Sequence, residues 1–290
     1  MIYRVRHSTV YAYTEPVPLC HNVVCLRPRD TERQRCLRHA LQITPEPAAW
    51  RERSDFFANA VADFSLQEPH TRMEIVAESE VEVQSADAPP APKIAWENVA
   101  DRLAGDAGGD CFNARPFTFD SPQSPRSEAA RDYARPSFPP GRDVVEAADD
   151  LMHRIYDDFD YVPGSTAVGT TVLEVLERRR GVCQDFAHLM LAGLRSMGLA
   201  ARYVSGYLVT RPPPGEDKLV GCDASHAWAG LFVPDFGWID FDPTNDVRPS
   251  HKHITVAVAR DYDDVAPVRG VILGGRQHAL RVSVDVRPID

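Results

Sequence analysis

The stretch RRRGVCQDFAHLMLAGLRSMG, residues 178–198, predicts a helix that begins at a cysteine. Its apolar side chains recur at helical spacing, at Phe186, Met190, Leu194 and Met197, and a glycine follows them. Cys183 lies where unpaired backbone N–H groups of the first turn carry partial positive charge, which stabilises a thiolate. The same N–H groups can hydrogen-bond an oxyanion that forms on an attacked carbonyl. Cys183 is therefore a candidate nucleophile, and the alternative is a small buried residue that packs the helix start.

Helices are expected before this stretch and strands after it. A helical apolar stripe consists of Val144, Ala148, Leu151, Met152, Ile155 and Phe159. Thr171 and Glu174 have the spacing of a capping box, so a second helix should begin there, and Gly181 is expected to end it. The strand patterns are ARYVSGYLV, HAWAGLFV, WIDFD and LRVSVDVR. This order predicts an α+β fold with helices first and an antiparallel sheet after them.

One hairpin of that sheet is expected to bring a histidine and an aspartate together. The turn PDFG joins HAWAGLFV to WIDFDPT. If its loop has three residues, Phe232 faces Trp238, and His226 has Asp242 as its diagonal neighbour on the same face. Asp240 lies one pair further away. A thiol, an imidazole that takes its proton and a carboxylate that orients the imidazole form the set that nucleophilic catalysis needs.

The chain before residue 143 has a different pattern. Residues 1–85 alternate apolar and polar side chains, as in IYRVRHSTVYAY and TRMEIVAESEVEV, and predict an antiparallel β domain. Residues 86–142 are rich in Pro, Gly, Ser and Asp, and predict a connection with short helices around 95–103 and 127–134. Residues 143–290 are expected to form the catalytic core, including the C-terminal strand.

Composition restricts the partners. The 32 Lys and Arg against 42 Asp and Glu give a net charge of −10, which argues against nucleic acid as a partner. The arginines between 27 and 38 are expected in a solvated loop. No run approaches the ~18 apolar residues of a membrane helix, and the alternating N-terminus does not resemble a signal peptide. We therefore expect no membrane association, a cytoplasmic protein, and reduced thiols at its six scattered cysteines.

A metal site is the competing interpretation of the cysteine. Cys183, His188, Cys222 and His226 are residues of the types that bind zinc. Cys183 and His188 are five positions apart, about 140° around a helix, so they do not share an ion easily. The sequence contains neither CxxC nor HExxH, and we expect no metal and no cofactor.

Three segments carry a family resemblance: GVCQDFAHLMLAGLRSMGLAARYVSGYL, SHAWAGLFVPDFGWIDFDPTND and HITVAVARDYDDVAPVRGV. Together they resemble the bacterial transglutaminase-like family, described as cysteine proteases, and the N-terminal part resembles the β domain that precedes the core in that family. The resemblance implies a papain-like α+β core. It also implies Cys183 as nucleophile, His226 as general base and Asp242 as the orienting carboxylate.

Further positions are less specific. The resemblance suggests an upstream aromatic residue that helps to hold the oxyanion, and Tyr161 is the candidate; the alternative is a tyrosine that caps the preceding helix. Gln184 either lines the site or only lies in the first helical turn. Trp228 either contacts substrate or packs in the sheet. The acidic segment RDYDD lacks the spacing of an EF-hand loop, so no calcium requirement is expected.

Two classes of function follow. The first is an enzyme that attacks an amide bond of a protein or peptide through a thioester at Cys183. Water as acceptor makes it a protease or amidase, which we favour, and an amine makes it a protein-glutamine transglutaminase. The second class is a non-enzymatic binding or assembly module in which the triad is a relic.

Overall fold

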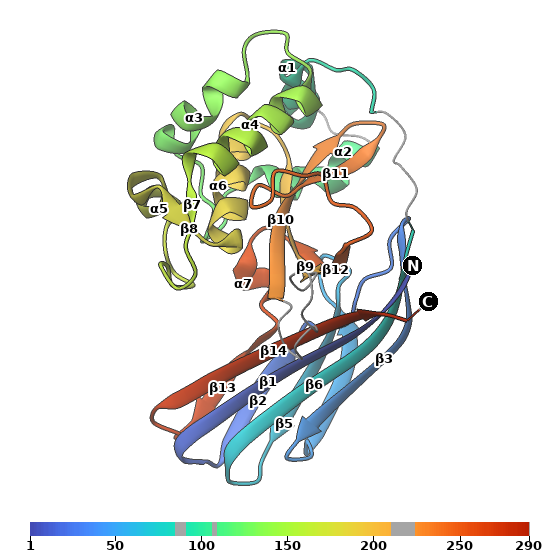
Figure 1. Ribbon diagram of the computed structural model, residues 1–290, viewed down its shortest axis with the longest axis vertical. Helices are drawn as coiled ribbons and strands as arrows, with labels where there is room; N and C mark the ends of the chain where they lie inside the picture. Colours follow the sequence, from blue (N-terminus) through green and yellow to red (C-terminus); the bar gives the residue numbers. More distant parts are fainter. Residues whose placement is uncertain (85–90, 106–108, 210–223, 290) are drawn as a thin grey trace, which may run out of the picture.

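Two four-stranded antiparallel sheets form a β domain at one end of the molecule (Figure 1). The computed structural model describes residues 1–84, 91–105, 109–209 and 224–289. One sheet has the order β14-β1-β6-β3 and the other the order β13-β2-β5-β4. Their strands are β1 (Ile2–Val17), β2 (Leu19–Val24), β3 (Gln34–Thr44), β4 (Ala49–Ser54), β5 (Ala60–Leu66), β6 (His70–Val83), β13 (Val268–Leu273) and β14 (His278–Pro288). Met73 and Ile75 of one sheet pack against Phe64 and Leu66 of the other, so the domain is a sandwich with its own apolar core.

The C-terminal strands belong to this sandwich. β14 pairs antiparallel with β1 from Tyr3 opposite Pro288 to Tyr13 opposite His278, and β13 pairs with β2. The expected place of the C-terminal strand, within a core of residues 143–290, is therefore wrong. Alternation in LRVSVDVR identifies a strand but contains no information about its partner, since pairing depends on tertiary structure.

The other end of the molecule is mixed α and β (Figure 1). Its sheet has the order β11-β10-β9-β12, and the helix α6 packs against β9 and β10. The elements are α4 (Val144–Asp158), β7 (Asp160–Tyr161), α5 (Val172–Arg178), β8 (Arg180–Gly181), α6 (Cys183–Ser196), β9 (Ala201–Leu208), β10 (Ala224–Val233), β11 (Gly237–Phe241), β12 (His253–Ala259) and α7 (Tyr262–Val265). Helices followed by an antiparallel sheet confirm the predicted α+β class.

The connecting segment contains helices that pack on this core. They are α1 (Trp96–Ala104), α2 (Asp110–Ala114) and α3 (Glu128–Ala134), and α3 lies against α6. The two short helices expected around 95–103 and 127–134 are thus present. Ser127 accepts a hydrogen bond from the backbone of Ala130 at the start of α3, which is the usual N-cap arrangement.

The start of α5 confirms the predicted capping box. Thr171 accepts from the backbone of Glu174, and the Glu174 carboxylate accepts from the Thr171 backbone. The predicted end at Gly181 is wrong. The helix ends at Arg178, and Arg179 after it has a left-handed φ of 52°. Gly181 belongs to β8 and pairs with Tyr161 of β7. The glycine is needed for space, because a Cβ at Gly181 would lie 2.9 Å from the Asp185 side chain.

Two buried amides join the β domain to the core sheet. The side chain of Gln34 donates to the carbonyl of Thr255 at 2.7 Å and accepts from its N–H at 2.8 Å. Asn59 makes the same pair of bonds with Val258, at 2.8 and 2.9 Å. Both targets lie on β12, which is an edge strand of the core sheet. The β domain therefore covers backbone groups that an edge strand otherwise leaves open.

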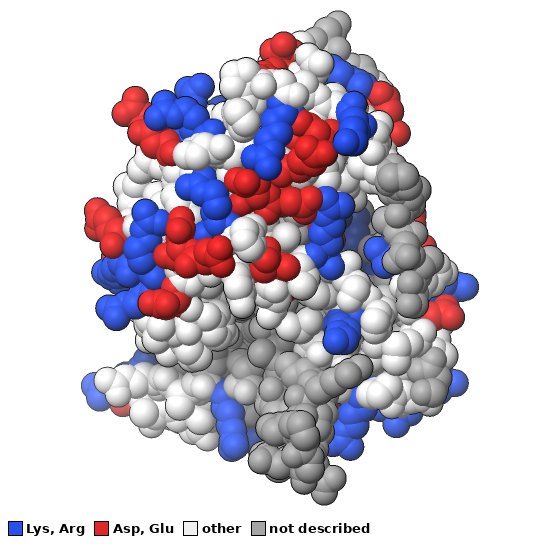
Figure 2. All heavy atoms as spheres, turned by 45° about the horizontal axis from the view of Figure 1, so that its top comes forward, with Lys and Arg blue, Asp and Glu red and all other residues white. Residues whose placement is uncertain are grey.

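The surface of the helical end carries both signs of charge. Figure 2 shows Lys and Arg interspersed with Asp and Glu over this face. Several of these side chains pair around α4, as in the contacts of Arg142 with Asp150 and of Arg248 with Asp149. Exposed pairs of this kind contribute little stability each. Among the described ranges, no helix is long and apolar enough to cross a membrane.

Candidate active site

Cys183 is the first residue of α6 and is half-buried. The helix start is held by Asp185, whose Oδ2 accepts from the backbone N–H of Val182 at 2.8 Å and from the Thr166 hydroxyl at 2.7 Å. The apolar face behind the cysteine, including Phe186, is fully buried. Cys183 is thus presented from a rigid helix end, with the free N–H groups of the first turn beside it.

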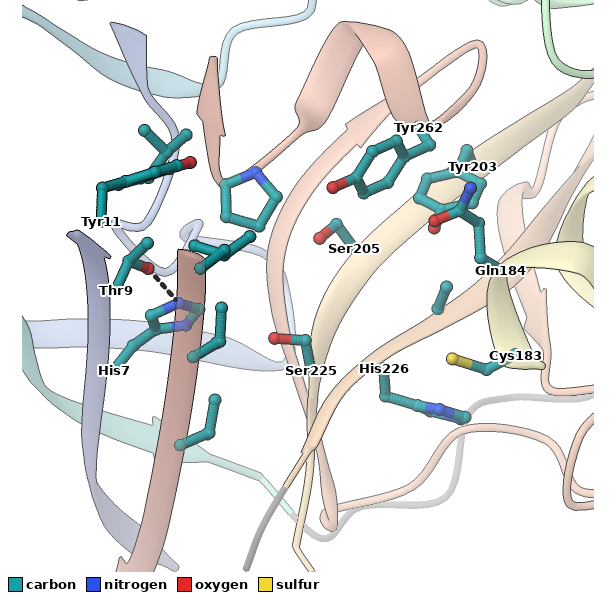
Figure 3. Close-up of a pocket in the computed structure, with 16 residues that line it drawn as sticks. His7, Thr9, Tyr11, Cys183, Gln184, Tyr203, Ser205, Ser225, His226 and Tyr262 are labelled. Atoms are coloured by element: carbon teal, nitrogen blue, oxygen red, sulfur yellow. Dashed lines mark hydrogen bonds between the residues drawn. The ribbon is translucent and has the colours of Figure 1, made fainter. Parts of the chain in front are cut away.

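His226 and Asp242 lie together as the hairpin register predicts. Phe232 faces Trp238 across the three-residue turn, which confirms the register. His226 Nε2 lies 2.7 Å from Asp242 Oδ2, and the two residues are 7% and 0% exposed. Since His226 Nε2 forms the hydrogen bond with the carboxylate, Nδ1 is the ring nitrogen available to the thiol of Cys183. Figure 3 shows the sulfur of Cys183 beside the His226 ring.

The electrostatics of this pair favour the charged imidazole. Burial alone would lower the pKa of His226. Hydrogen bonds to Asp242 and Cys183, and the negative charge of both partners, outweigh burial and raise the pKa of His226 to about 10. Burial likewise opposes ionisation of Asp242, but hydrogen bonds from His226 and His253 lower the pKa of Asp242 far below its usual range. The arrangement therefore favours a protonated His226 beside Cys183.

Asp242 is also held by residues that sequence analysis missed. His253 Nε2 lies 3.1 Å from Asp242 Oδ2, and the Asn245 amide donates to the same oxygen at 2.7 Å. The backbone N–H of Ser250 donates to His253 Nδ1, so Nε2 is the ring nitrogen that donates a hydrogen bond to the carboxylate. Asn245 lies only three residues after Asp242, which is a local signal for its contact, whereas nothing in the local pattern connects His253 to this site.

The possible ligand atoms of His226, Asp242 and His253 lie within 4.8 Å of one another, which makes these residues a candidate metal site. Zinc ligands at about 2.0–2.2 Å in tetrahedral geometry are separated by roughly 3.3 Å or more. The 2.7 Å between His226 Nε2 and Asp242 Oδ2 is instead a hydrogen-bond distance. The three residues therefore fit a hydrogen-bonded cluster better than a zinc site. The expected absence of a metal stays a prediction.

The zinc set expected from the sequence as an alternative does not form around His188. His188 is buried, and its Nε2 accepts from the backbone N–H of Tyr262 at 3.2 Å. Burial lowers the pKa of His188 to about 4. Its role is therefore to hold the chain at Tyr262. Cys222, the other member of that set, lies outside the described residues.

Tyr161 and Gln184 lie near Cys183, on two different elements. Tyr161 is half exposed in β7, and its ring contacts Phe186. Burial and the charge of Cys183 raise the pKa of Tyr161, which places the phenol within electrostatic reach of the thiol. Gln184 lines the cavity at Cys183, and its amide donates to the carbonyl of Val168 at 3.3 Å. Their roles toward an oxyanion or substrate stay predictions.

Trp228 is not placed to contact substrate, which corrects one of the predicted site residues. Its side chain is 0% exposed, and its indole N–H donates to Asp240 at 3.2 Å. The ring lies against His226 and His253, at centroid distances of 5.9 and 5.3 Å. Trp228 therefore supports the histidines from within the sheet. The alternation of apolar and polar residues in a strand shows which side chains are buried. It does not show whether a buried side chain lines the active site or only packs behind it.

The segment RDYDD holds the chain at the start of α7 beside the cavity. Asp261 is fully buried, accepts from the backbone N–H of Asp263 at the start of α7, and accepts from the N–H of Gln123. Its charge also faces the buried Arg195 of α6. Together with the bond from Tyr262 to His188, these contacts place Tyr262 over the cavity at Cys183.

A cavity of about 450 Å³ opens at Cys183 and His226 (Figure 3). One side consists of core residues, including Tyr203, Ser205 and Tyr262. The other side consists of residues of β1 and β14 in the β domain, among them Thr9 and Val282. The cavity is therefore shared by both ends of the molecule, and its volume is in the usual range for small-molecule sites.

Comparisons with known proteins agree with this architecture. Residues 3–82 match the bacterial transglutaminase-like N-terminal region, and residues 131–243 match the transglutaminase-like superfamily. A crystal structure of a proposed cysteine protease from Cytophaga hutchinsonii has the same fold, with a TM-score of 0.77 at 22% identity, over 100% of this chain and 91% of that one.

Two mycobacterial relatives are similar over nearly their full length. An uncharacterized protein of Mycobacterium tuberculosis (strain H37Rv) is 44% identical, over 99% of this chain and 93% of the relative. One of Mycobacterium leprae is 36% identical, over 98% and 97%. A protein-glutamine gamma-glutamyltransferase of Pseudomonas aeruginosa is 32% identical over 149 residues, which are 49% of this chain and 22% of that protein.

Proposed function

The chain belongs to the bacterial transglutaminase-like family, whose core is that of cysteine-based enzymes, and we propose that it cleaves amide bonds of proteins or peptides by acyl transfer through Cys183. In this proposal His226 is the general base and Asp242 orients it. The observation that carries the proposal is the buried 2.7 Å contact of His226 with Asp242, next to a cysteine at a helix start.

The proposed reaction has two halves. In the first, the Cys183 thiolate attacks the amide carbonyl carbon, the carbonyl electrons move to oxygen, and the first-turn N–H groups of α6 stabilise the oxyanion. His226 gives its proton to the leaving amine as the C–N bond breaks, which leaves a thioester on Cys183. In the second, His226 takes a proton from water, the resulting hydroxide attacks the thioester carbon, and the thiolate leaves with the carboxylic acid as product.

We propose hydrolysis as the main outcome, since water needs no binding site of its own and the cavity at Cys183 then serves a single substrate. An amine acceptor would instead give transamidation of a glutamine side chain. This second candidate is supported by the similarity to the Pseudomonas aeruginosa gamma-glutamyltransferase. Both use the same three residues, so the acceptor must be measured.

A product assay tests the proposal. Peptides with internal glutamines are incubated with the protein and a primary amine, and mass spectrometry identifies cleaved, deamidated and amine-linked products. We expect cleaved or deamidated products that depend on Cys183. Cys183→Ala is the control, and amine-linked products without hydrolysis would move the transglutaminase to first place. The same products from Cys183→Ala would instead favour the non-enzymatic module.

The cellular site is part of the proposal. Five of the six cysteines are described, and all five are free thiols: Cys20, Cys25, Cys36, Cys111 and Cys183. Free thiols suit a reducing compartment, which supports a cytoplasmic location. We also propose that neither nucleic acid nor a membrane is a partner, in agreement with the net charge of −10 and the mixed signs of charge on the helical face in Figure 2.

A further inference from the structure

One wall of the cavity at Cys183 is an apolar sheet edge that the core leaves uncovered. On β14, the side chains of Leu280, Val282, Val284 and Val286 point to one face, because alternate residues of a strand do. Val284 and Val286 are buried under the core, whereas Val282 and Leu280 are 49% and 54% exposed. The same apolar stripe thus continues from the protein interior into the cavity.

The neighbouring strand extends this wall. Thr9 of β1 lies opposite Val282, and Tyr11 lies opposite Leu280. All four residues line the cavity. Figure 3 shows Thr9 and Tyr11 on the side of the cavity that faces Cys183 across the opening. We call these four residues the sheet-edge wall. Exposed apolar side chains next to a nucleophile indicate a surface that is covered when a ligand binds.

Among the residues that the structure describes, the lining of the cavity carries no permanent charge apart from the nucleophile and its base. None of the described lining residues is Asp, Glu, Lys or Arg. His7 lies in the wall of the cavity, where burial lowers its pKa to about 4, so the ring is neutral near pH 7. Its two nitrogens are engaged by the Tyr207 hydroxyl at 3.0 Å and the Thr9 hydroxyl at 3.1 Å.

We propose that this cavity receives an uncharged, apolar or aromatic group of the acyl donor, and that Leu280 and Val282 of β14 determine this preference. The inference rests on the proposed function, in which the acyl group is transferred to Cys183. A charged group would lose its hydration at the sheet-edge wall, where the described residues carry no opposite charge, whereas an apolar group gains from burial there. The β domain then selects the substrate, and the core performs the chemistry.

Alkylation with matched reagents separates the pocket from the nucleophile. Iodoacetamide, N-benzyliodoacetamide and iodoacetate are reacted with the folded protein, and the rate at Cys183 is measured by peptide mass spectrometry. Each rate is divided by the rate of the same reagent with glutathione. We expect the benzyl reagent to exceed iodoacetamide at least tenfold at Cys183, and iodoacetate to fall below it.

Substitutions in the sheet-edge wall test whether it determines the preference for the benzyl reagent. Leu280→Glu and Val282→Glu should each reduce the benzyl-to-iodoacetamide ratio at least tenfold. Leu280 is more than half exposed, so Leu280→Glu remains informative if Val282→Glu does not fold. Ser283→Glu is the matched control, since it adds the same charge on the opposite face of the same strand and should leave the ratio unchanged.

The outcomes distinguish the two levels of the proposal. Slow iodoacetamide labelling of Cys183, no faster than that of the other cysteines, would count against the proposed function itself. Fast iodoacetamide labelling without a benzyl preference would overturn the apolar subsite and leave the nucleophile standing. A benzyl preference that both Leu280→Glu and Val282→Glu retain would likewise overturn the apolar subsite and leave the nucleophile standing.

Discussion

Asp242 is the residue on which the proposed site depends most. A buried carboxylate is costly unless it is hydrogen-bonded, and this one accepts from His226, His253, Asn245 and the backbone of Thr244. Four donors fix the carboxylate in one position. The carboxylate in turn fixes the imidazole of His226 with Nδ1 toward the thiol. His253 is therefore a positioning residue that acts on the nucleophile through two others.

Substitution of His253 tests this chain of contacts. His253→Ala removes a donor to an ionised carboxylate, so the free energy of unfolding should fall by about 1.5–3 kcal/mol in urea titrations. Alkylation of Cys183 at pH 6 should also slow severalfold, because His226 is less well oriented. His253→Gln offers an N–H donor at a similar position and should retain more of both quantities. Equal losses in the two variants would indicate that His253 matters for packing alone.

The charge of His226 predicts how stability depends on pH. Its pKa in the folded protein is about 10, against an ordinary value of 6.5. The folded state thus holds this proton more tightly, so its contribution to stability is complete below about pH 6.5 and is lost as pH rises through about 10. The difference in unfolding free energy between the wild type and His226→Gln should shrink steadily from pH 6 to pH 9. A difference that grows with pH over this range would contradict the assigned charge.

At the residue scale, sequence predicts the parts of the site that local geometry connects. Cys183 is identifiable because a helix start is visible in the pattern. His226 and Asp242 are identifiable because one short turn sets the register between them. His253 and Tyr262 are not identifiable from the sequence. They reach the site from β12 and α7 through tertiary packing, which the spacing of residues along the chain does not show.

Among the elements, β9 shows how closely the sheet is packed behind the histidines. A Cβ at Gly206 would lie 2.2 Å from the carbonyl oxygen of Ile254 and 2.5 Å from the ring of Trp228. Trp228 in turn packs against His226 and His253. The absence of a side chain at Gly206 therefore allows the tryptophan to support both histidines.

Gly206→Ala should accordingly be costly. Overpacking of a tight core costs about 1–3 kcal/mol, and a clash with backbone places this variant at the upper end. We expect a lower midpoint in urea and slower alkylation of Cys183. Gly169→Ala is the matched control, because a Cβ there meets nothing within 4 Å and should change stability little. If Gly206→Ala were as stable as Gly169→Ala, the close packing of Trp228 would not hold in solution.

Element types are predicted better than their ends and partners. The capping box of α5 and the apolar stripe of α4 depend on residues close together in the chain, and both predictions are confirmed. The end of α5 depends on the left-handed backbone of Arg179, and an arginine does not indicate such a conformation in a sequence. The short strands β2, β4, β12 and β13 are not predicted. β12, for example, is buried along nearly its whole length and so shows no alternation of apolar and polar residues.

At the scale of the whole molecule, the β domain and the core share one structure. The first and last strands pair with each other, so the chain closes on itself through the sandwich. Tyr3 and Val5 of β1 belong to the same apolar cluster as the core helices. The amides of Gln34 and Asn59 hold β12 from the side of the β domain. These contacts predict that neither part is independent of the other.

Unfolding should therefore be cooperative. Tryptophan fluorescence, which reports mainly on the core through Trp96, Trp228 and Trp238, should change at the same urea concentration as the far-ultraviolet circular dichroism of the whole chain. Asn59→Ala should lower both midpoints together. Two separate transitions in the wild type would show that the sandwich and the core are independent units.

The proposed reaction depends on a thiolate–imidazolium pair of Cys183 and His226. The most direct measurement is the rate of iodoacetamide labelling of each cysteine in the folded protein from pH 5 to pH 9, located by peptide mass spectrometry, beside His226→Ala. We expect Cys183 to label fastest, to keep labelling near pH 6, and to slow at least tenfold in the variant. Labelling of Cys183 only above about pH 8, at the rate of the other thiols and unchanged in His226→Ala, would contradict the pair and favour a non-enzymatic role.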